Sequence, residues 1–185
     1  MRVISGIYKR RMFTIPKTFK ARPTTDFAKE NLFNVLVNNY IDFEGEKIMA
    51  LDLFAGTGGI SIELISRGCK QVVSVEKDKK HLDFIKKIMA EVKTDKSIPI
   101  KGDAFQFIKS SHQQFDFIFA DPPYDLLHME KVPELIFQHQ LLKEGGILVF
   151  EHGKNHDYTT HPNFIDHRAY GSVNFSFFRQ TQDAL

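Results

Sequence analysis

The sequence contains a single cysteine, Cys69, among its 185 residues, which excludes an internal disulfide framework. No apolar run approaches the roughly 20 residues that a membrane-spanning helix needs. The apolar residues of the N-terminal segment MRVISGIYKRR are scattered among basic ones, so this segment has no signal-peptide core. We therefore expect a cytoplasmic protein, long enough to bury a core without help from disulfides or metal.

Acidic residues are absent from the first 22 positions, although the whole chain carries 23 of them against 25 Lys and Arg. The basic residues of this segment are Arg2, Lys9, Arg10, Arg11, Lys17, Lys20 and Arg22. A basic block that faces solvent attracts a polyanion such as RNA. A solvated chain end without a partner would have the same composition, so composition alone leaves both interpretations open.

From position 47 onward, apolar runs typical of strands alternate with helical periodicity. The pattern predicts strands at 48–54, 71–76, 97–103, 115–120 and 145–151. It predicts three helices: one that ends near Arg67, one at 78–93 and one near 128–138. Such alternation predicts a mainly parallel sheet with helices on both faces. The tail departs from it, because apolar runs at 164–170 and 173–178 flank Gly171-Ser172, a two-residue hairpin turn.

The predicted fold class is therefore α/β, with a Rossmann-like, mainly parallel seven-stranded sheet that ends in a C-terminal antiparallel hairpin. Residues 1–43 form a short N-terminal basic extension, and residues 44–185 form the main domain. Within the extension we expect a short hairpin around Gly6, then a helix from an N-cap at Thr24 or Thr25 to about Asn38.

A glycine-rich turn follows the first predicted strand and opens a helix. Ligands of open α/β sheets sit at the carboxyl ends of strands, and glycines there let a ligand approach the backbone. A dinucleotide site would need a third glycine where this chain has Ser61. Asp52, just before the turn, is unfavourable near a pyrophosphate and favourable near the sulfonium and amino group of S-adenosyl-L-methionine. The turn therefore favours S-adenosyl-L-methionine as the cofactor.

Two more carboxylates follow the next two predicted strands. Glu76 lies 20 residues after Gly56, where a carboxylate can accept hydrogen bonds from both ribose hydroxyls. Asp103 can accept from the adenine amino group, while Ala104 supplies a backbone N–H. Each carboxylate alone would more often cap a turn or a helix. Three at successive strand ends, together with the glycine-rich turn, favour a cofactor site.

The tetrapeptide Asp121-Pro122-Pro123-Tyr124, after the fourth predicted strand, is the most specific motif in the chain. Prolines cannot donate to a sheet, so the backbone leaves it in a stiff turn whose carbonyls join the Asp121 carboxylate as acceptors. Such acceptors can hold an exocyclic amino group and stabilise the positive charge of its attacking nitrogen. Tyr124 can stack on the base, which must be unpaired or flipped to reach this site. An ordinary strand-terminating turn is the alternative.

The segments DLFAGTGG (52–59) and DPPY (121–124) together resemble amino-directed nucleic-acid methyltransferases of Rossmann-like fold. Segments 2–6, 8–11, 22–26 and 29–33, the helix end at 66–68 and the Gly171 hairpin resemble the RsmD family in particular. The resemblance covers nearly the whole chain. Members of that family methylate guanine N2 in the small-subunit (16S) ribosomal RNA of bacteria.

The resemblance implies an S-adenosylmethionine-dependent methyltransferase with catalysis at Asp121, Pro122, Pro123 and Tyr124. It implies cofactor contacts at Asp52, Phe54, Gly56, Glu76, Asp103 and Ala104, and with these we group the neighbouring Ala55, Gly58 and Lys77. It implies RNA contacts by the basic arm and the segment after it, at Lys9, Arg10, Arg11, Arg22, Thr24 and Thr25. Phe27 and Lys29 stand where the resemblance leads us to expect arginines, which affects the detailed RNA contacts rather than the chemistry.

We expect the partner to be 16S ribosomal RNA or an assembly intermediate of the small ribosomal subunit, with no membrane, for a monomeric enzyme. No metal is expected: His152 and His156 are four apart, but Gly153 and Asn155 disfavour a helix and no carboxylate or cysteine completes a ligand set. The DPPY motif alone also fits an adenine-N6 methyltransferase of DNA or RNA, or one that acts on a protein glutamine amide. From another class, a non-catalytic ribosome-assembly protein that binds RNA is the alternative.

Overall fold

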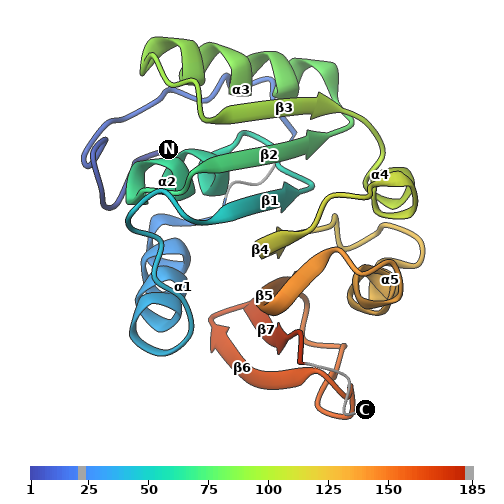
Figure 1. Ribbon diagram of the computed structural model, residues 1–185. Coiled ribbons are helices and arrows are strands. Elements are labelled where there is room, and N and C mark those ends of the chain that lie inside the picture. The colour runs from blue at the N-terminus through green and yellow to red at the C-terminus, as the bar shows by residue number, and fades with distance from the viewer. Residues whose placement is uncertain (21–23, 182–185) are drawn as a thin grey trace.

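A seven-stranded sheet runs through the protein in the strand order β3-β2-β1-β4-β5-β7-β6 (Figure 1). The computed structural model describes residues 1–20 and 24–181. The strands are β1 (Met49–Leu53), β2 (Gln71–Glu76), β3 (Ser97–Lys101), β4 (Phe115–Ala120), β5 (Leu142–His152), β6 (Phe164–Tyr170) and β7 (Val173–Arg179). β1 to β5 pair in parallel, whereas β7 runs antiparallel to both β5 and β6. The predicted fold class and the C-terminal antiparallel hairpin are confirmed.

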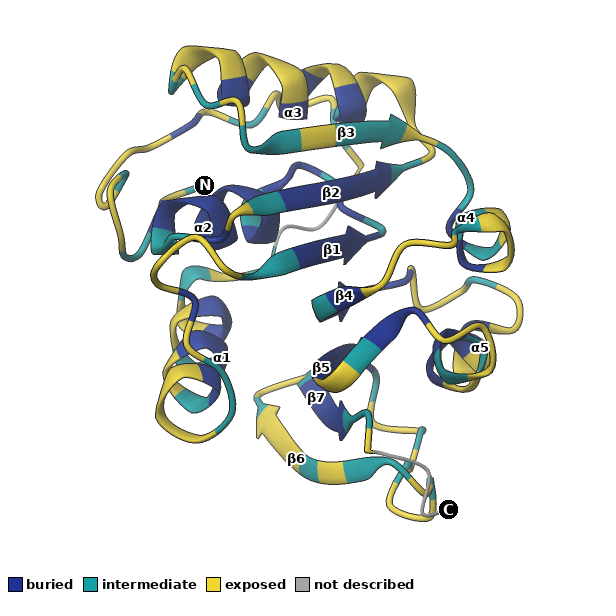
Figure 2. Cartoon of the chain, in the orientation of Figure 1, coloured by how far each residue is buried: buried dark blue, intermediate teal, exposed yellow. Residues whose placement is uncertain are grey.

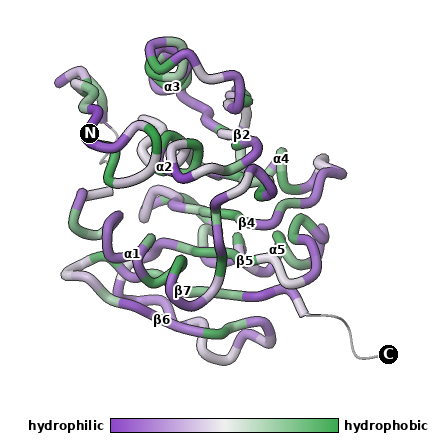
Figure 3. The backbone as a smooth tube through the Cα atoms, turned by 60° about the vertical axis from the view of Figure 1, so that its left-hand side comes forward, coloured by the Kyte–Doolittle hydropathy of each residue, from purple (hydrophilic) through white to green (hydrophobic). Residues whose placement is uncertain are grey.

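Helices cover both faces of this sheet. They are α1 (Asp26–Asn39), α2 (Gly59–Arg67), α3 (Lys79–Glu91), α4 (Ala104–Ser110) and α5 (Val132–Gln138), with a 3-10 turn η1 at Met129–Lys131. Buried residues of α1, α2 and α3 form one apolar core with the sheet, and those of α4 and α5 form a second core on the other face. The central strands are buried almost throughout, as Figure 2 shows in dark blue. β6, at the edge, is mostly exposed and mixes hydrophilic and hydrophobic segments (Figure 3).

The helix ends follow local sequence signals. The Thr25 side chain accepts a hydrogen bond from Ala28 N at 3.2 Å and begins α1 as an N-cap, and Asp78 caps α3 in the same way. Gly68, with φ 112°, ends α2 in the left-handed conformation that a C-cap glycine adopts. These three ends agree with the sequence, since each rests on a single residue type in a single place.

Besides shifts of one or two residues at the ends of other elements, the structure differs from the sequence prediction in three places. α4 was not predicted, because it is only 7 residues long and too short for a periodic pattern. β5 begins at Leu142 instead of 145, since an irregularity in its pairing with β4 accommodates Gly145 at φ 74°. The predicted helix at 128–138 divides into η1 and α5, with a proline in the first turn of α5.

The first 13 residues lie along α2. Arg2 and Met12 form an antiparallel bridge, in agreement with the predicted short hairpin, and Val3 and Phe13 are buried in the core shared with α1 and α2. Gly6 lies so close to the carbonyl of Ser66 that a Cβ there would be 1.8 Å from its oxygen. The arm is therefore closely packed against the body of the protein.

Candidate active site

The strand order reverses between β1 and β4, and the predicted site residues lie at the carboxyl ends of the strands on either side of this point. This is where open α/β sheets bind ligands. In sheet order the carboxylates are Asp103 after β3, Glu76 at the end of β2, Asp52 near the end of β1 and Asp121 after β4. Residues from four separate parts of the sequence thus meet along one edge, where the strand arrowheads point in Figure 1.

The turn between β1 and α2 is held open by unusual backbone conformations. Phe54 has φ 60°, which is uncommon for a residue with a side chain, and Gly56 and Gly58 have φ 54° and 77°. The backbone is fixed by a hydrogen bond from Ala55 N to Val75 O at 3.0 Å and by another from Gly58 N to Ala55 O at 2.8 Å. Strain of this kind is typical of ligand-binding loops.

Asp52 is buried, with 1% of its surface exposed. The Ser61 hydroxyl donates to its Oδ2 at 2.6 Å and lies 2.7 Å from the Ser74 hydroxyl. Burial, against the opposing hydrogen bonds from Ser61, and the negative charge of Glu76 together raise the pKa of Asp52 to about 7. Ser61, which the sequence marked only as a missing glycine, is therefore the partner of this carboxylate.

Glu76 and Asp103 are held by backbone N–H groups. Glu76 accepts from Gly56 N and from Asp78 N, each at 2.7 Å, and so connects the glycine-rich turn to the start of α3. Asp103 caps α4 by accepting from Gln106 N at 3.2 Å, and it lies 3.6 Å from the exposed Lys77 ammonium. Ala104, the first residue of α4, is buried. The capping role that a lone carboxylate commonly has is thus present at Asp103, at the same edge as the other acidic residues.

The tetrapeptide leaves the sheet at the end of β4. Pro122 is buried, Pro123 is exposed and Tyr124 is 52% exposed. The backbone N–H of Asp121 still reaches Leu53 O on β1 at 3.4 Å, and Pro123 O accepts from Leu126 N at 2.9 Å. The motif therefore combines a rigid backbone with an aromatic ring that is open to solvent.

Glu151 is a member of this site that the sequence reasoning missed. In the β4–β5 register Ala120 pairs with Phe150, so Asp121 and Glu151 are the next residues on neighbouring strands. Adjacent strands lie about 4.8 Å apart, which brings the two carboxylates to the same place. The Tyr124 hydroxyl donates to Glu151 Oε1 at 3.5 Å. A carboxylate at the end of the fifth strand was the available signal, but only the strand order shows that it lies beside Asp121.

Both carboxyl groups have raised pKa values. Burial raises the pKa of Asp121 well above its ordinary value, and the negative charges of Glu151 and then Asp52 raise it further. Burial also raises the pKa of Glu151 to about 7, against the hydrogen bond from Tyr124. Perturbed carboxyl groups that share a buried edge are typical of functional sites, because a fold gains no stability from placing them together.

The basic residues lie at some distance from this edge. Lys9, Arg10 and Arg11 are exposed at the tip of the arm, near the carboxyl end of α2, and Arg11 pairs with Glu91 of α3 at 3.1 Å. The arm loops past the left of the sheet in Figure 1, whereas the arrowheads of β1, β2 and β3 point right. Thr24 and Thr25 precede α1, whose first turn brings Phe27 to 6.2 Å from the Tyr170 ring in the β6–β7 hairpin. The predicted contact at Arg22 lies outside the described residues.

Lys29 and Phe27, the two departures from the expected arginines, have different surroundings. Lys29 is buried: its ammonium donates to Arg2 O at 2.5 Å and lies 3.7 Å from the Glu63 carboxylate, and burial lowers its pKa. Phe27 is 67% exposed. The replacement at position 29 therefore concerns the docking of the arm, and the replacement at position 27 concerns an exposed surface near the active-site edge.

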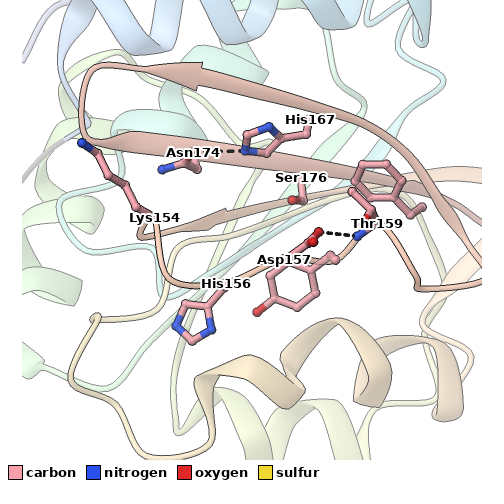
Figure 4. A pocket seen from close by; sticks show the side chains of 9 residues that line it. Lys154, His156, Asp157, Thr159, His167, Asn174 and Ser176 are labelled. Carbon is pink, nitrogen blue, oxygen red and sulfur yellow. Dashed lines mark hydrogen bonds between the residues drawn. The ribbon is translucent and has the colours of Figure 1, made fainter.

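A cavity of about 160 Å³, lined by none of the predicted site residues, lies between the loop after β5 and the β6–β7 hairpin (Figure 4). His167 on β6 and Asn174 on β7 are hydrogen-bonded at 3.1 Å across it. The ring nitrogens of His152 contact Gly153 O and the Ser176 hydroxyl, each at 2.8 Å.

Within residues 1–20 and 24–181, no group of three or more His, Cys, Asp or Glu could hold a metal ion. In the same part of the chain, no helix is both long and apolar enough to cross a bilayer.

Comparison with known proteins identifies relatives over almost the whole chain. The model of the family described as "Conserved hypothetical protein 95" matches residues 1–179. "Ribosomal RNA small subunit methyltransferase D" of Buchnera aphidicola (Baizongia pistaciae) is 31% identical over 82% of this chain and 75% of its own length. The protein of the same name from Haemophilus influenzae is 28% identical over 97% of this chain and 93% of its own. The solved structure of yhhF from Escherichia coli, described as a candidate methyltransferase, has a TM-score of 0.84 and 24% identity, with 99% of both chains covered.

Proposed function

The chain belongs to this family, which is the RsmD family, and from that premise we propose that it transfers a methyl group from S-adenosyl-L-methionine to the exocyclic N2 amino group of a guanine in 16S ribosomal RNA. The observation that carries the proposal is the position of Asp121-Pro122-Pro123-Tyr124. The motif lies at the reversal of strand order, next to the glycine-rich turn of β1. An isolated turn of that sequence would have no reason to lie there.

The residues of β1, β2 and β3 fit the cofactor. Bound S-adenosyl-L-methionine supplies an electrophilic methyl group on a positively charged sulfur. Gly56 and Gly58 let a ligand approach the backbone of the turn, and Asp52 contributes negative charge beneath it. Glu76 has the acceptor oxygens that two ribose hydroxyls need, and Asp103 with Ala104 N–H fits the edge of an adenine ring.

The residues that follow β4 would hold the nucleophile. The Asp121 carboxylate and the backbone carbonyls of the prolines accept the N–H bonds of the amino group and orient its lone pair toward the methyl group. As the nitrogen attacks it becomes positive, and these acceptors stabilise that charge. Placement does much of the remaining work, since a fixed in-line geometry replaces a rare collision. Tyr124, half exposed, is available to stack on the flat face of the base.

The RNA would approach along the face that carries α1 and the arm. Thr24 and Thr25 lie before the helix whose first turn contacts the β6–β7 hairpin, and the exposed Lys9 and Arg10 provide positive charge near the end of α2, farther from the site. Only an unpaired or flipped guanine can enter the site. We propose 16S ribosomal RNA or an assembly intermediate of the small subunit as the substrate of a cytoplasmic, monomeric enzyme.

A methyl-transfer assay tests this function. Immature small ribosomal subunits, naked 16S ribosomal RNA and DNA are each incubated with radiolabelled cofactor, and the modified nucleoside is identified by mass spectrometry. We expect N2-methylguanine in the RNA or the subunits. N6-methyladenine, or label in DNA alone, would refute the substrate assignment, and no cofactor binding by calorimetry would favour a non-catalytic assembly protein.

The role of the tetrapeptide is tested by Asp121→Ala. Because Asp121 is placed against the amino group, we expect this variant to lose methyl transfer while its cofactor affinity stays nearly unchanged. Glu134→Gln on the exposed side of α5 is the control, with full activity. A large loss of cofactor binding in Asp121→Ala would show that Asp121 belongs to the cofactor site instead.

A further inference from the structure

Glu151 has an unused hydrogen-bonding atom inside the site. Glu151 is only 5% exposed, and its Oε1 accepts a hydrogen bond from the Tyr124 hydroxyl. The other oxygen, Oε2, is buried and has no hydrogen-bond partner within the described part of the chain. A buried acceptor without a donor is costly, and such an atom at a functional edge indicates that a ligand supplies the donor.

The position of Glu151 favours the base over the cofactor as that ligand. Glu151 is the penultimate residue of β5, which is separated from β1 by β4, whereas the acidic residues that fit the cofactor lie at or just after the ends of β1, β2 and β3. Asp121 and Glu151 occupy equivalent positions on neighbouring strands, so their side chains leave the sheet on the same face. An amino group held by Asp121 therefore has Glu151 beside it.

The chemistry of guanine matches two adjacent acceptors. Its Watson–Crick edge carries the N2 amino group and, next to it, the N1–H donor. Adenine carries its amino group next to a bare N1 lone pair, which would face a carboxylate oxygen and be repelled by it. A site built to accept a specific N–H rejects an analogue that lacks it, because the buried acceptor is left unpaired.

We propose that Glu151 is a specificity-determining residue that accepts the N1–H of the target guanine, so that the pair Asp121–Glu151 selects guanine over bases without a hydrogen at N1. This inference rests on the proposed function, since it assigns a role at the same site. Tyr124 has two roles in it: its ring stacks on the base, and its hydroxyl orients the Glu151 carboxylate.

The test uses a base that keeps the 2-amino group but lacks the N1 hydrogen, and with it the O6 carbonyl; the loss of O6 is the same for the wild type and for Glu151→Gln, so the comparison between them isolates the contact with Glu151. Once the target nucleotide has been mapped, small subunits are assembled on ligated RNA that carries guanine or 2-aminopurine at that position. We expect the wild type to prefer guanine by roughly 10- to 100-fold in kcat/KM, the range of a hydrogen bond to a charged group. In Glu151→Gln, a neutral isostere, kcat/KM for guanine should fall about 10-fold or more while that for 2-aminopurine stays within about 3-fold.

Controls separate this role from a structural one. Glu151→Gln should have a thermal midpoint no lower than that of the wild type and should keep its cofactor affinity, and Glu134→Gln should keep both the activity and the base preference. Glu151→Asp, which withdraws the carboxylate by one methylene group, should show a smaller loss of the same selectivity and remains usable if Glu151→Gln does not fold.

An equal fall of kcat/KM for both bases would overturn the inference, and so would a loss of cofactor affinity in Glu151→Gln. If the wild type makes N2-methylguanine and Glu151→Gln keeps the same preference for guanine over 2-aminopurine, the inference is overturned and the proposed function stays intact. A wild type that makes no N2-methylguanine would remove the proposed function, and this inference with it.

Discussion

Replacing Asp52 with asparagine should stabilise the protein and weaken cofactor binding. Asp52 is buried at the end of β1, and burial raises its pKa to about 7. The unfolded chain ionises this group near its ordinary value of 3.8, so between these two values folding must keep a proton that the unfolded state releases. The free energy of unfolding of the wild type is therefore highest below the unfolded pKa of 3.8. It falls as the pH rises from there, until Asp52 also ionises in the folded protein at about pH 7.

The size of the effect follows from the two pKa values. The difference between 3.8 and about 7 corresponds to about 4 kcal/mol of free energy of unfolding. Asparagine does not titrate, and its side-chain oxygen can still accept the hydrogen bond that Ser61 donates to Asp52 at 2.6 Å. We expect Asp52→Asn to be more stable than the wild type by about 2 kcal/mol at pH 5 and about 4 kcal/mol at pH 8.

Urea unfolding at pH 5 and pH 8 measures this difference, and calorimetry with S-adenosyl-L-methionine measures the cofactor affinity. Asp83→Asn is the control, because Asp83 is exposed and its ion pair is with the exposed Lys79 on the same helix; its effect should stay within about 0.5 kcal/mol at both pH values. A stability difference that does not grow between pH 5 and pH 8, or a variant less stable than the wild type at pH 8, would refute the reasoning.

Three further predictions concern the rate, the turn and the RNA. Because the pKa of Glu151 is raised to about 7 and that of Asp121 is also raised, and ionised carboxylates accept the stronger hydrogen bonds, kcat should rise between pH 6 and pH 8; a flat profile in single-turnover assays would contradict it. Gly58→Ala should lower the free energy of unfolding by about 1–3 kcal/mol, since φ is 77° and a Cβ would lie 2.9 Å from Ile85 Cγ1; an unchanged urea midpoint would count against this. The double variant Lys9→Ala, Arg10→Ala should weaken RNA binding similarly for all sequences and reduce the salt slope by about 2, with cofactor affinity unchanged; an unaltered slope would show that the arm does not contact phosphates.

The sequence predicts those parts of the site that one segment determines by itself. The glycine-rich turn, the N-cap at Thr25 and the C-cap at Gly68 each depend on a few consecutive residues, and the structure has all three. The strands were found because each is a short apolar run with polar ends. The α/β alternation then leaves few topologies open.

The parts that the sequence could not give depend on contacts between distant segments. Glu151 lies beside Asp121 only because β5 pairs with β4, a register that no local pattern encodes. Glu63 is similar: within its helix it is an ordinary acidic residue, yet it is fully buried and accepts from Ile4 N and Ser5 N at 2.8 and 3.0 Å. A helical pattern does not show which surface will be covered by the N-terminal arm.

Two pairs of carboxylates at the active-site edge of the sheet differ in how many hydrogen bonds their oxygens already accept. Glu76 and Asp103 already accept hydrogen bonds from backbone N–H groups. Burial raises the pKa values of both Asp121 and Glu151, the negative charge of Glu151 raises that of Asp121 further, and one Glu151 oxygen is without a donor among the described residues. The pair Glu76 and Asp103 is therefore preorganised without a ligand, whereas the pair Asp121 and Glu151 is stabilised only when a ligand supplies N–H donors. Guanine has three N–H bonds on one edge, and adenine has two. The unpaired acceptors of Asp121 and Glu151 destabilise the free enzyme, and because they need N–H donors they also favour guanine.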